Sequence, residues 1–358
     1  MMENKRLYVD FHVLQTVPPS CVNRDDTGSP KTAVYGGVTR ARVSSQAWKR
    51  AMRLMFGSLL KEGQLGVRTK KIVALVAGEI AALAPEADAS ALAVKALAEA
   101  GLNIKSEDKG TEALFFMSKA QAAALAQLAV EGCKDKKAYK NALKEAPSVD
   151  MALFGRMVAS DPSLNYDAAA QVAHSISTHG VQNEYDYFTA VDDCAPEDNV
   201  GAGHLGTVEF NSSTLYRYAT VNVTELAATL GPEQSPAVLR AFAQAFICSM
   251  PTGKQNTFAN RTLPDAVYLT VREDQPVNLC GAFEKAVPPS ANGFAEPSIM
   301  RLASYAKQIY TNFTGEPEEA FVIGEGMEEL SGASMTMNSL LDALEDAVRR
   351  RLPVGEVS

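Results

Sequence analysis

The sequence has few of the features that mark several common protein classes. Its five cysteines are widely spaced and form no CxxC pair, which argues against a disulfide framework and against a zinc knuckle. No uninterrupted apolar run reaches about 18 residues, so no transmembrane helix is expected. The first residues lack the basic-then-apolar pattern of a secretory signal. We therefore expect a cytoplasmic protein with free thiols that does not contact a membrane.

Catalytic motifs are scarce as well. Nothing resembles a nucleophile elbow or a Ser-His-Asp set. The segment Pro251–Thr257 contains a glycine, a lysine and several amides, but it lacks the first glycine of a P-loop, and Gln255 replaces the Ser or Thr. This segment could contact a phosphate through its backbone or could be an ordinary turn.

Positive charge is absent from residues 157–216, which contain no Lys or Arg but nine Asp and Glu and three of the four histidines. Clusters of this kind can bind a divalent metal, and a nuclease would use His174, His179, Asp192 and His204. However, the first two histidines are five residues apart, about 140° around a helix. We therefore favour packing and capping roles, expect no cofactor, and keep the metal-dependent nuclease as the alternative.

The charge that is present is unevenly distributed. The net charge is −8, but residues 1–71 carry 13 Lys and Arg against 5 Asp and Glu. A basic end on an acidic chain suggests a surface that faces a polyanion. It is also compatible with two ends of one subunit that attract each other in an assembly.

A strand followed by a helix is predicted over residues 38–60. Arg40 and Arg42 alternate onto one strand face, and Ser44 or Ser45 is a suitable N-cap. The first helical turn contains no acidic residue, although the helix dipole favours one there. Either an anion binds among these cations and the free N–H groups, or the cations are solvated or paired elsewhere in the fold. Sequences tend to depart from such local preferences at functional sites, which favours the interpretation that an anion binds here.

The same helix has two faces at helical spacing. Trp48, Met52, Met55 and Leu59 form an apolar stripe, so Trp48 is predicted to lie in the core rather than to stack on bases. Lys49, Arg50 and Arg53 occupy the opposite face.

The order of elements predicts an α+β fold. Strands are expected at 7–14, 184–191, 216–223 and 266–272, and helices at 45–60 and 235–250, with alanine-rich helices inserted over 61–179. This β-α-β-β-α-β order is the ferredoxin-like pattern that also underlies RNA-recognition folds. The aromatic RNP1 signature is missing, so RNA binding would have to use another mode.

Several stretches together resemble the CasC-type backbone subunit of type I-E CRISPR Cascade. They are residues 11–53 (FHVLQTVPPSCVNRDDTGSPKTAVYGGVTRARVSSQAWKRAMR), MALFGRM, HSISTH, YFTAVDD, HLGTVEF, YRYATVNV and FEKAV. The block 11–53 is the most specific, because so many contiguous polar residues agree. The helical region 61–148 and the C-terminal tail contribute little.

The resemblance implies a hand-shaped subunit without catalytic activity. It would have an RNA-recognition-like (ferredoxin-like) palm at 1–60, a helical finger insertion at 61–180, a palm strand at 181–192, a β-hairpin thumb at 193–215 and the rest of the palm, with an acidic tail, at 216–358. Copies would stack head to tail along a CRISPR guide RNA that pairs with target DNA. Other Cascade subunits and a separate helicase-nuclease would be the remaining partners.

The resemblance also implies which residues contact the guide. Its backbone would be held by Asn23, Arg24, Lys31, Arg40, Arg42, Ser44, Ser45, Lys49 and Arg53, with a second set at Gly253, Lys254 and Gln255. The finger tip would contribute Arg156 and Met157, and the thumb Phe188, Thr189, His204 and Leu205. Met157, Phe188 and Leu205 would be apolar wedges between nucleotides, although Phe188 could also pack in the core.

Overall fold

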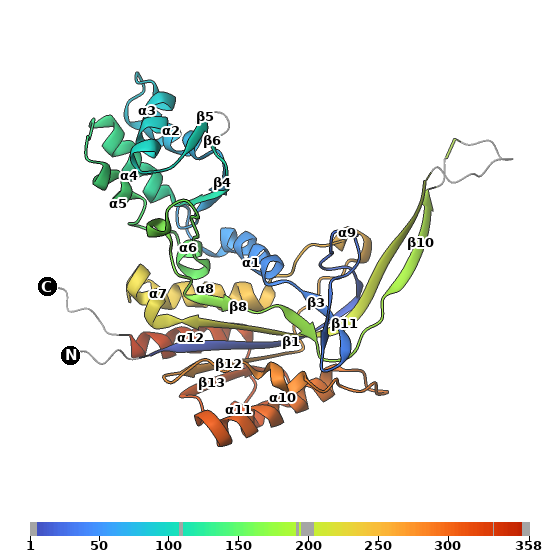
Figure 1. Cartoon of the computed structure of the whole chain (residues 1–358). Coiled ribbons are helices and arrows are strands. Elements are labelled where there is room, and N and C mark those ends of the chain that lie inside the picture. Colours follow the sequence, from blue (N-terminus) through green and yellow to red (C-terminus); the bar gives the residue numbers. More distant parts are fainter. Residues whose placement is uncertain (1–5, 107–109, 191–192, 195–203, 332, 353–358) are drawn as a thin grey trace. The chain divides into compact units, whose positions relative to one another are not determined.

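The computed structural model describes residues 6–106, 110–190, 193–194, 204–331 and 333–352. The chain divides into two compact units (Figure 1). Unit 1 comprises Met1–Leu54, Val172–Thr220 and Phe242–Ala347. Unit 2 comprises Met55–Gln171, Val221–Ala241 and Val348–Ser358.

An antiparallel sheet organises unit 1. Its main path runs β13-β12-β1-β11-β9-β3-β2, while β8 and β10 each pair with β11. The strands are β1 Tyr8–Ser20, β2 Thr32–Tyr35, β3 Val38–Val43, β8 Ala170–Val172, β9 Ser175–Ser177, β10 Glu184–Ala190, β11 His204–Asn222, β12 Ala266–Arg272 and β13 Glu319–Ile323. The expected strands and the mixed α and β composition are thus confirmed.

Both faces of the central strand β1 are buried, although polar and apolar residues alternate along its first half. Phe11 packs against Phe242 and Phe246 of α8, with ring centroids 5.2 and 5.8 Å apart. On the other face, Asp10 and His12 are fully buried. The polar residues of this strand therefore serve a second buried layer rather than solvent.

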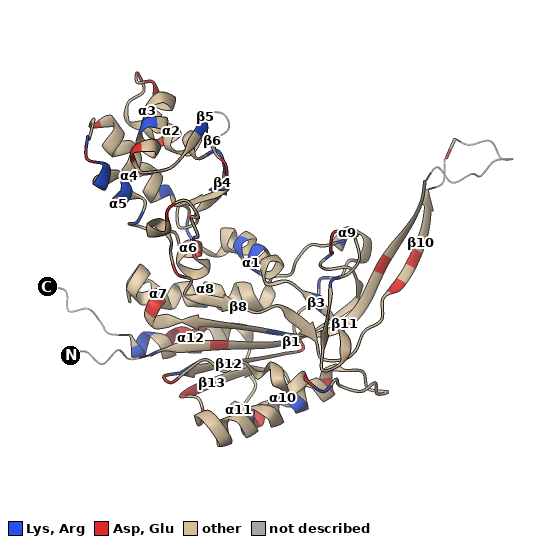
Figure 2. Ribbon diagram, viewed as in Figure 1, with Lys and Arg blue, Asp and Glu red and all other residues tan. Residues whose placement is uncertain are grey.

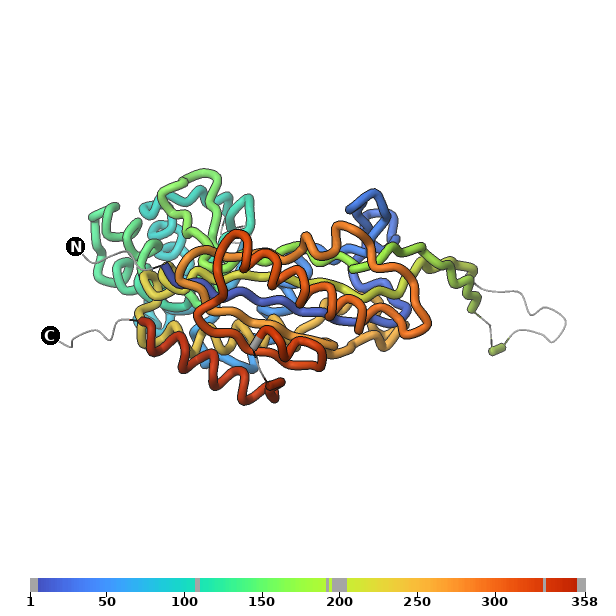
Figure 3. The backbone as a smooth tube through the Cα atoms, turned by 90° about the horizontal axis from the view of Figure 1, so that it is seen from below, coloured from blue at the N-terminus to red at the C-terminus, as the bar shows by residue number. Residues whose placement is uncertain are grey.

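That second layer consists of helices on the face of the sheet seen from below in Figure 3. A core cluster joins Leu14, Tyr216 and Tyr268 of the sheet to Leu302 and Tyr310. The helical elements of unit 1 that lie wholly within its ranges are α9 Gln255–Phe258, α10 Ala295–Ile309 and α11 Glu328–Ser331, with a 3-10 segment Leu279–Phe283 and a π-helical turn Tyr310–Thr314. Three helices, α1 Ser45–Leu59, α8 Ser235–Cys248 and α12 Met337–Arg351, contain unit boundaries, as do the strands β8 and β11.

Unit 2 contains the alanine-rich insertion. Its core unites α2 Ile72–Leu83, α3 Ala89–Glu99, α4 Lys119–Val130 and α5 Lys136–Ala142. The remaining elements are α6 Val149–Phe154, α7 Val223–Leu230, a 3-10 segment Pro162–Leu164, and two small ribbons, β4 Val67–Thr69 with β7 Phe115–Met117 and β5 Ile104–Ser106 with β6 Gly110–Thr111. Helix α6 ends at Phe154, because Gly155 follows it with a left-handed φ of 76°.

The connection between β1 and β2 is short, although residues 15–37 are rich in Pro, Gly, Asn and Asp. β1 continues to Ser20 and β2 begins at Thr32, so only residues 21–31 form the connection. Within it, Asp25 Oδ1 accepts hydrogen bonds from the N–H groups of Thr27 and Ser29 at 2.9 and 3.0 Å. The Lys31 N–H donates to the Asn23 carbonyl at 2.8 Å, so the connection is an ordered hairpin.

Candidate nucleic-acid interface

The start of α1 is built as the sequence suggested. Ser44 follows β3 directly, and its Oγ accepts the Ala47 N–H at 3.4 Å, so Ser44 is the N-cap. The Ser44 N–H in turn donates to Asn23 Oδ1 at 2.9 Å. Asn23 thereby ties the 21–31 hairpin to the helix start. Ser45 is the first helical residue, and no acidic side chain lies in the first turn.

Basic side chains gather beside this helix start. Arg42 donates to the Thr32 carbonyl at 3.1 Å and lies 3.0 Å from His174 Nδ1. Burial lowers the pKa of His174, and the charges of Arg42 and Lys31 lower it further. Neutral His174 accepts the hydrogen bond from Arg42, so it does not add a charge of its own at neutral pH. Arg42 has further donors beyond these two contacts, and Lys31 lies near the same histidine, so both stay candidates for the predicted phosphate contacts.

Arg40 does not belong to this group. Its guanidinium is fully buried and donates to the carbonyls of Tyr35, Ser177, Phe283 and Glu284 at 2.9–3.2 Å. Arg40 and Arg42 are two residues apart on β3 and share a strand face, so alternation does not separate them. Arg40 is enclosed because the main chain of residues 283–284 lies over it. The prediction that Arg40 contacts RNA is corrected: its donors are already used by four main-chain acceptors.

The buried face of α1 lies where the helical spacing of its apolar residues predicted it. Trp48, Met52 and Phe56 are buried, and the Trp48 Nε1–H donates to Ser175 Oγ at 2.9 Å. Trp48 is thus a core residue, as predicted. Lys49 and Arg53, one turn apart, are both half-buried (Figure 2 shows the basic residues of α1 in blue).

The second predicted set of guide contacts, residues 253–255, lies against the first. A Cβ on Gly253 would stand 2.1 Å from the Val22 carbonyl oxygen, so only glycine allows this approach. Burial raises the pKa of the Cys21 thiol, while the nearby cations Arg24 and Lys254 oppose that rise. The structure therefore brings Asn23, Arg24 and the 253–255 segment together, although they are more than 200 residues apart in the sequence.

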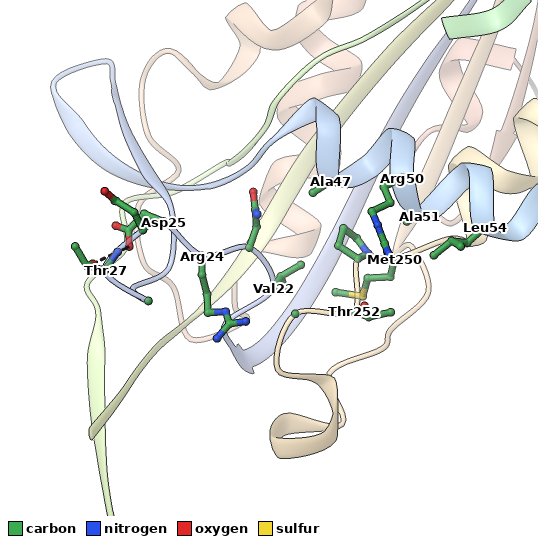
Figure 4. Close-up of a pocket in the computed structure, with 15 residues that line it drawn as sticks. Val22, Arg24, Asp25, Thr27, Ala47, Arg50, Ala51, Leu54, Met250 and Thr252 are labelled. Carbon is green, nitrogen blue, oxygen red and sulfur yellow. Dashed lines mark hydrogen bonds between the residues drawn. The ribbon is translucent and has the colours of Figure 1, made fainter. Parts of the chain in front are cut away.

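A pocket of about 540 Å³ opens where these segments meet α1 (Figure 4). Arg24 comes from the hairpin, and Arg50 extends from α1 toward the Met250–Thr252 segment. Arg50 was placed on the polar face of the helix but not among the predicted contacts. The spacing of Ala47, Arg50 and Leu54 could have indicated that these three share one face.

The two predicted finger-tip residues, Arg156 and Met157 of unit 2, differ in their exposure. Arg156 is buried and donates to the carbonyls of Leu164, Phe116 and Leu143 at 2.7–3.1 Å. The prediction of an RNA contact by Arg156 is corrected for the same reason as for Arg40. Met157, the next residue, is 83% exposed and remains a candidate wedge.

The thumb candidates lie on a two-stranded ribbon formed by β10 and residues 204–210 of β11, which we call the arm. Directly paired residues of an antiparallel ribbon share a face. Phe188 pairs with Gly206, and Thr189 pairs with Leu205, so Phe188 and Leu205 lie on opposite faces. A Cβ on Gly206 would lie 2.4 Å from the Phe188 ring, which therefore covers the glycine.

Both candidate wedges of the arm are accessible. Phe188 is 40% exposed and Leu205 57% exposed, so neither is a core residue. The charged residues of the arm, Glu184, Asp186 and Glu209, are all acidic (Figure 2). His204 occupies a strand position opposite Ala190, but its side chain lies outside the described part of the structure.

The alternative metal site gains no support. His179 is buried, its Nδ1 lies 2.8 Å from the Gly180 carbonyl, and its Nε2 accepts the Thr214 N–H at 3.1 Å. Both ring nitrogens are therefore used by the backbone. Asp192 lies outside the described residues, and within those residues no cluster of His, Cys, Asp and Glu is placed to hold a metal ion. None of the helices in the described ranges has the length and apolar character needed to cross a bilayer.

Comparison with known families gives the class of this protein. The family described as CT1975-like protein matches residues 9–349, and the chain belongs to this family. The resemblance to CasC-type backbone subunits is thereby confirmed.

Two solved structures identify the relatives more closely. A chain of a "CRISPR RNA-guided surveillance complex, pre-nicking" is 34% identical, with a TM-score of 0.80, and the match covers 95% of this chain and 100% of the other. A chain of a "CRISPR RNA-guided surveillance complex" is 30% identical, with a TM-score of 0.64 and coverages of 95% and 99%. The comparison with curated proteins gave no match.

Proposed function

We propose that this protein is a non-catalytic, guide-binding backbone subunit of a type I-E CRISPR Cascade. The observation that carries the proposal is the start of α1. Lys31 and Arg42 lie beside a helix N-terminus that has no acidic residue, and Lys49 and Arg53 follow on the same helix. Free N–H groups and cations together form a phosphate site.

Binding of this kind does not depend on base identity. Lysine and arginine contacts to phosphates provide sequence-independent affinity, which a protein that must accept any guide requires. Discrimination is left to base pairing between the guide and target DNA, as in other RNA-guided systems. In this proposal Arg24, Lys254 and the Gly253–Gln255 backbone extend the phosphate track from α1.

The exposed apolar side chains have a separate role. Met157, Phe188 and Leu205 would insert between nucleotides and divide the guide into short segments. Because Phe188 and Leu205 lie on opposite faces of the arm, a strand that crosses the arm would meet one of them on each side. Thr189 and the His204 position lie beside these wedges.

Assembly is proposed to be head to tail. The acidic arm of one copy would approach the basic α1 region of the next, and a heterologous contact that does not close produces a helical filament. In this scheme the sheet of unit 1, with α1 and α8, is the ferredoxin-like palm, the insertion is the finger, and the arm belongs to the thumb. The predicted domain boundaries are part of the same proposal, as are a cytoplasmic location and a separate helicase-nuclease that cuts the target.

Charge reversal on α1 tests the function directly. The double change Lys49→Glu and Arg53→Glu should remove co-purifying RNA, because four units of charge change at the phosphate track. The measurement is the ratio of absorbance at 260 nm to that at 280 nm, followed by sequencing of the bound RNA. A matched control, Lys285→Glu with Lys307→Glu, changes the net charge equally on exposed positions of unit 1.

Two results would contradict the proposal. The first is RNA retained by the α1 double variant. The second is equal RNA loss in the control variant, which would indicate a general effect of net charge rather than a site.

A further inference from the structure

A buried cation connects the two predicted sets of phosphate contacts. Arg217 of β11 is 1% exposed, and its guanidinium lies over the indole ring of Trp48 in α1, 3.8 Å from the ring centroid. A guanidinium is attracted to the face of an indole ring, more strongly when both groups are removed from water. Trp48 directly precedes Lys49, so Arg217 supports α1 where the first set of predicted contacts lies.

The same guanidinium holds the end of α8. It donates a hydrogen bond to the Phe246 carbonyl and lies 3.5 Å from the Ile247 carbonyl oxygen, both in the last turn of that helix. Carbonyl groups at a helix C-terminus lack partners within the helix and carry negative partial charge, so a cation suits them. Residues 249–262 continue from this end of α8 and include the predicted contacts 253–255. Arg217 therefore fixes the point from which the second set starts.

The far end of that segment is tied to Arg217 as well. Arg217 donates to Gln15 Oε1 at 2.6 Å, and Gln15 Nε2 donates to the carbonyl and the hydroxyl of Thr262 at 2.9 and 3.2 Å. Gln15 is itself buried, so these bonds are shielded from solvent. Both ends of residues 249–262 thus bond to one buried pair of side chains, and all of these residues lie in unit 1.

The burial of this cation is costly for the fold. Desolvation lowers the pKa of Arg217 to about 9, and among the described residues the group that counteracts this is the Cys248 thiol rather than a carboxylate. An apolar side chain of similar size in place of a buried charge is often no less stable. Departures of this kind from the usual preferences occur mainly at functional sites, which indicates a role beyond packing.

We propose that Arg217 is a positioning residue for guide binding, which holds α1 and residues 249–262 in the relative position that lets one RNA strand contact both. The inference rests on the proposed guide binding and adds to it a residue that touches no RNA. Without the guanidinium, α1 keeps Lys49 and Arg53, but Lys254 is no longer held at a fixed distance from them. Binding by Lys254 then weakens, because ordering a loose segment on binding costs free energy.

A double-mutant cycle tests the positioning role. The full-length protein and its Arg217→Met variant are each combined with Lys254→Gln, and affinity for an oligouridine RNA is measured at several salt concentrations, well below the melting temperature of every variant. In the unmodified background, Lys254→Gln should lower the slope of log affinity against log salt by about 0.7, the value for one single-strand phosphate contact. In the Arg217→Met background the slope should already be lower, and Lys254→Gln should change it no further.

Arg272 provides the matched control. It is also a fully buried arginine, but it belongs to the second layer, with its guanidinium 5.2 Å from the centroid of the Tyr310 ring. Arg272→Met should lower the melting temperature, as Arg217→Met does. Lys254→Gln should nevertheless keep its full effect on the salt slope in the Arg272→Met background, because this arginine contacts neither α1 nor residues 249–262.

A milder variant keeps the test decisive if Arg217→Met does not fold. Gln15→Met leaves the guanidinium in place and removes the hydrogen bonds to Thr262. It should therefore reduce the effect of Lys254→Gln on the salt slope while the contribution of Lys49 and Arg53 is kept.

The outcomes that contradict the inference differ from those that contradict the proposed function. If Lys254→Gln has the same effect with and without Arg217, the arginine only stabilises the fold and the positioning role is overturned. The same conclusion follows if the effect also disappears in the Arg272→Met control, or if Lys254→Gln has no effect in the unmodified protein. If the unmodified protein does not bind the RNA at all, the proposed function itself fails.

Discussion

The buried guanidinium of Arg40 tests which cations of the basic region stabilise the fold and which bind RNA. Its donors bond four main-chain carbonyls, all within unit 1. In Arg40→Gln, the shorter amide can replace at most two of these bonds. At least two buried carbonyls then lose their donor, at about 1–3 kcal/mol each.

The expected loss of unfolding free energy is therefore about 3–5 kcal/mol, including the space left by the shorter side chain. For a unit of about 200 residues this corresponds to a melting temperature lower by about 10 °C. Thermal and urea unfolding measure the loss of stability. RNA titration at several salt concentrations measures whether the variant still binds RNA in the same way. Folded Arg40→Gln should keep the salt dependence of RNA binding found in the unmodified protein.

Arg53→Gln is the matched comparison and should behave in the opposite way. Its melting temperature should fall by clearly less than that of Arg40→Gln, since Arg53 is only half-buried whereas Arg40 is fully buried. The slope of log affinity against log salt should fall by about 0.7, the value for one single-strand phosphate contact. If Arg40→Gln instead melted normally and lost this same slope, the guanidinium would have to reach RNA, and its structural assignment would be wrong.

Three further predictions follow from other parts of the fold. Burial lowers the pKa of His12 to about 3 and raises that of Asp10 to about 6. Below pH 6.5, the ordinary pKa of histidine, the unfolded chain binds a proton that buried His12 does not, so acidification destabilises the fold. Asp10 acts in the opposite direction: its protonated form stabilises the fold fully below pH 3.8, and this stabilisation is lost as the pH rises through 6. As the pH is lowered from 6 to 4, the free energy of unfolding of Asp10→Asn should fall more steeply than that of the unmodified protein, by about 1.4 kcal/mol per pH unit. Urea titrations measure this difference, and parallel curves for the two proteins would refute it. Gly206→Val should displace the Phe188 ring and weaken RNA binding as much as Phe188→Ala, about fivefold, without changing the melting temperature. Labelled RNA should stay intact when Mg²⁺ or Mn²⁺ is titrated into the protein, and metal-dependent cleavage would favour the nuclease alternative.

Local patterns predicted individual elements well. The alternation of β1, the serine before α1 and the stripe through Trp48 each depend on residues a few positions apart. Such short-range signals act through backbone geometry, so they can be read from a linear sequence. The pairing of distant segments is different, because contact between residues 22 and 253 depends on how the whole sheet folds.

Charge was harder to interpret than apolarity. Arg40 and Arg42 stand two residues apart and look equivalent in sequence, yet one is enclosed by carbonyls and the other borders the helix start. Arg156 and Met157 reverse the usual expectation, since the cation is buried and the apolar residue is exposed. A guanidinium can serve either role because its five donors suit carbonyl groups and phosphates equally.

The sequence by itself determined the family, the helices and strands, and the excess of cations near the amino end, because all of these depend on residue identity and short-range spacing. Only the tertiary structure decided which cations remain accessible, that the hairpin and the 253 segment form one pocket, and that Phe188 and Leu205 face opposite ways. Burial and pairing register are set by contacts between residues far apart in the chain, and no local pattern encodes them.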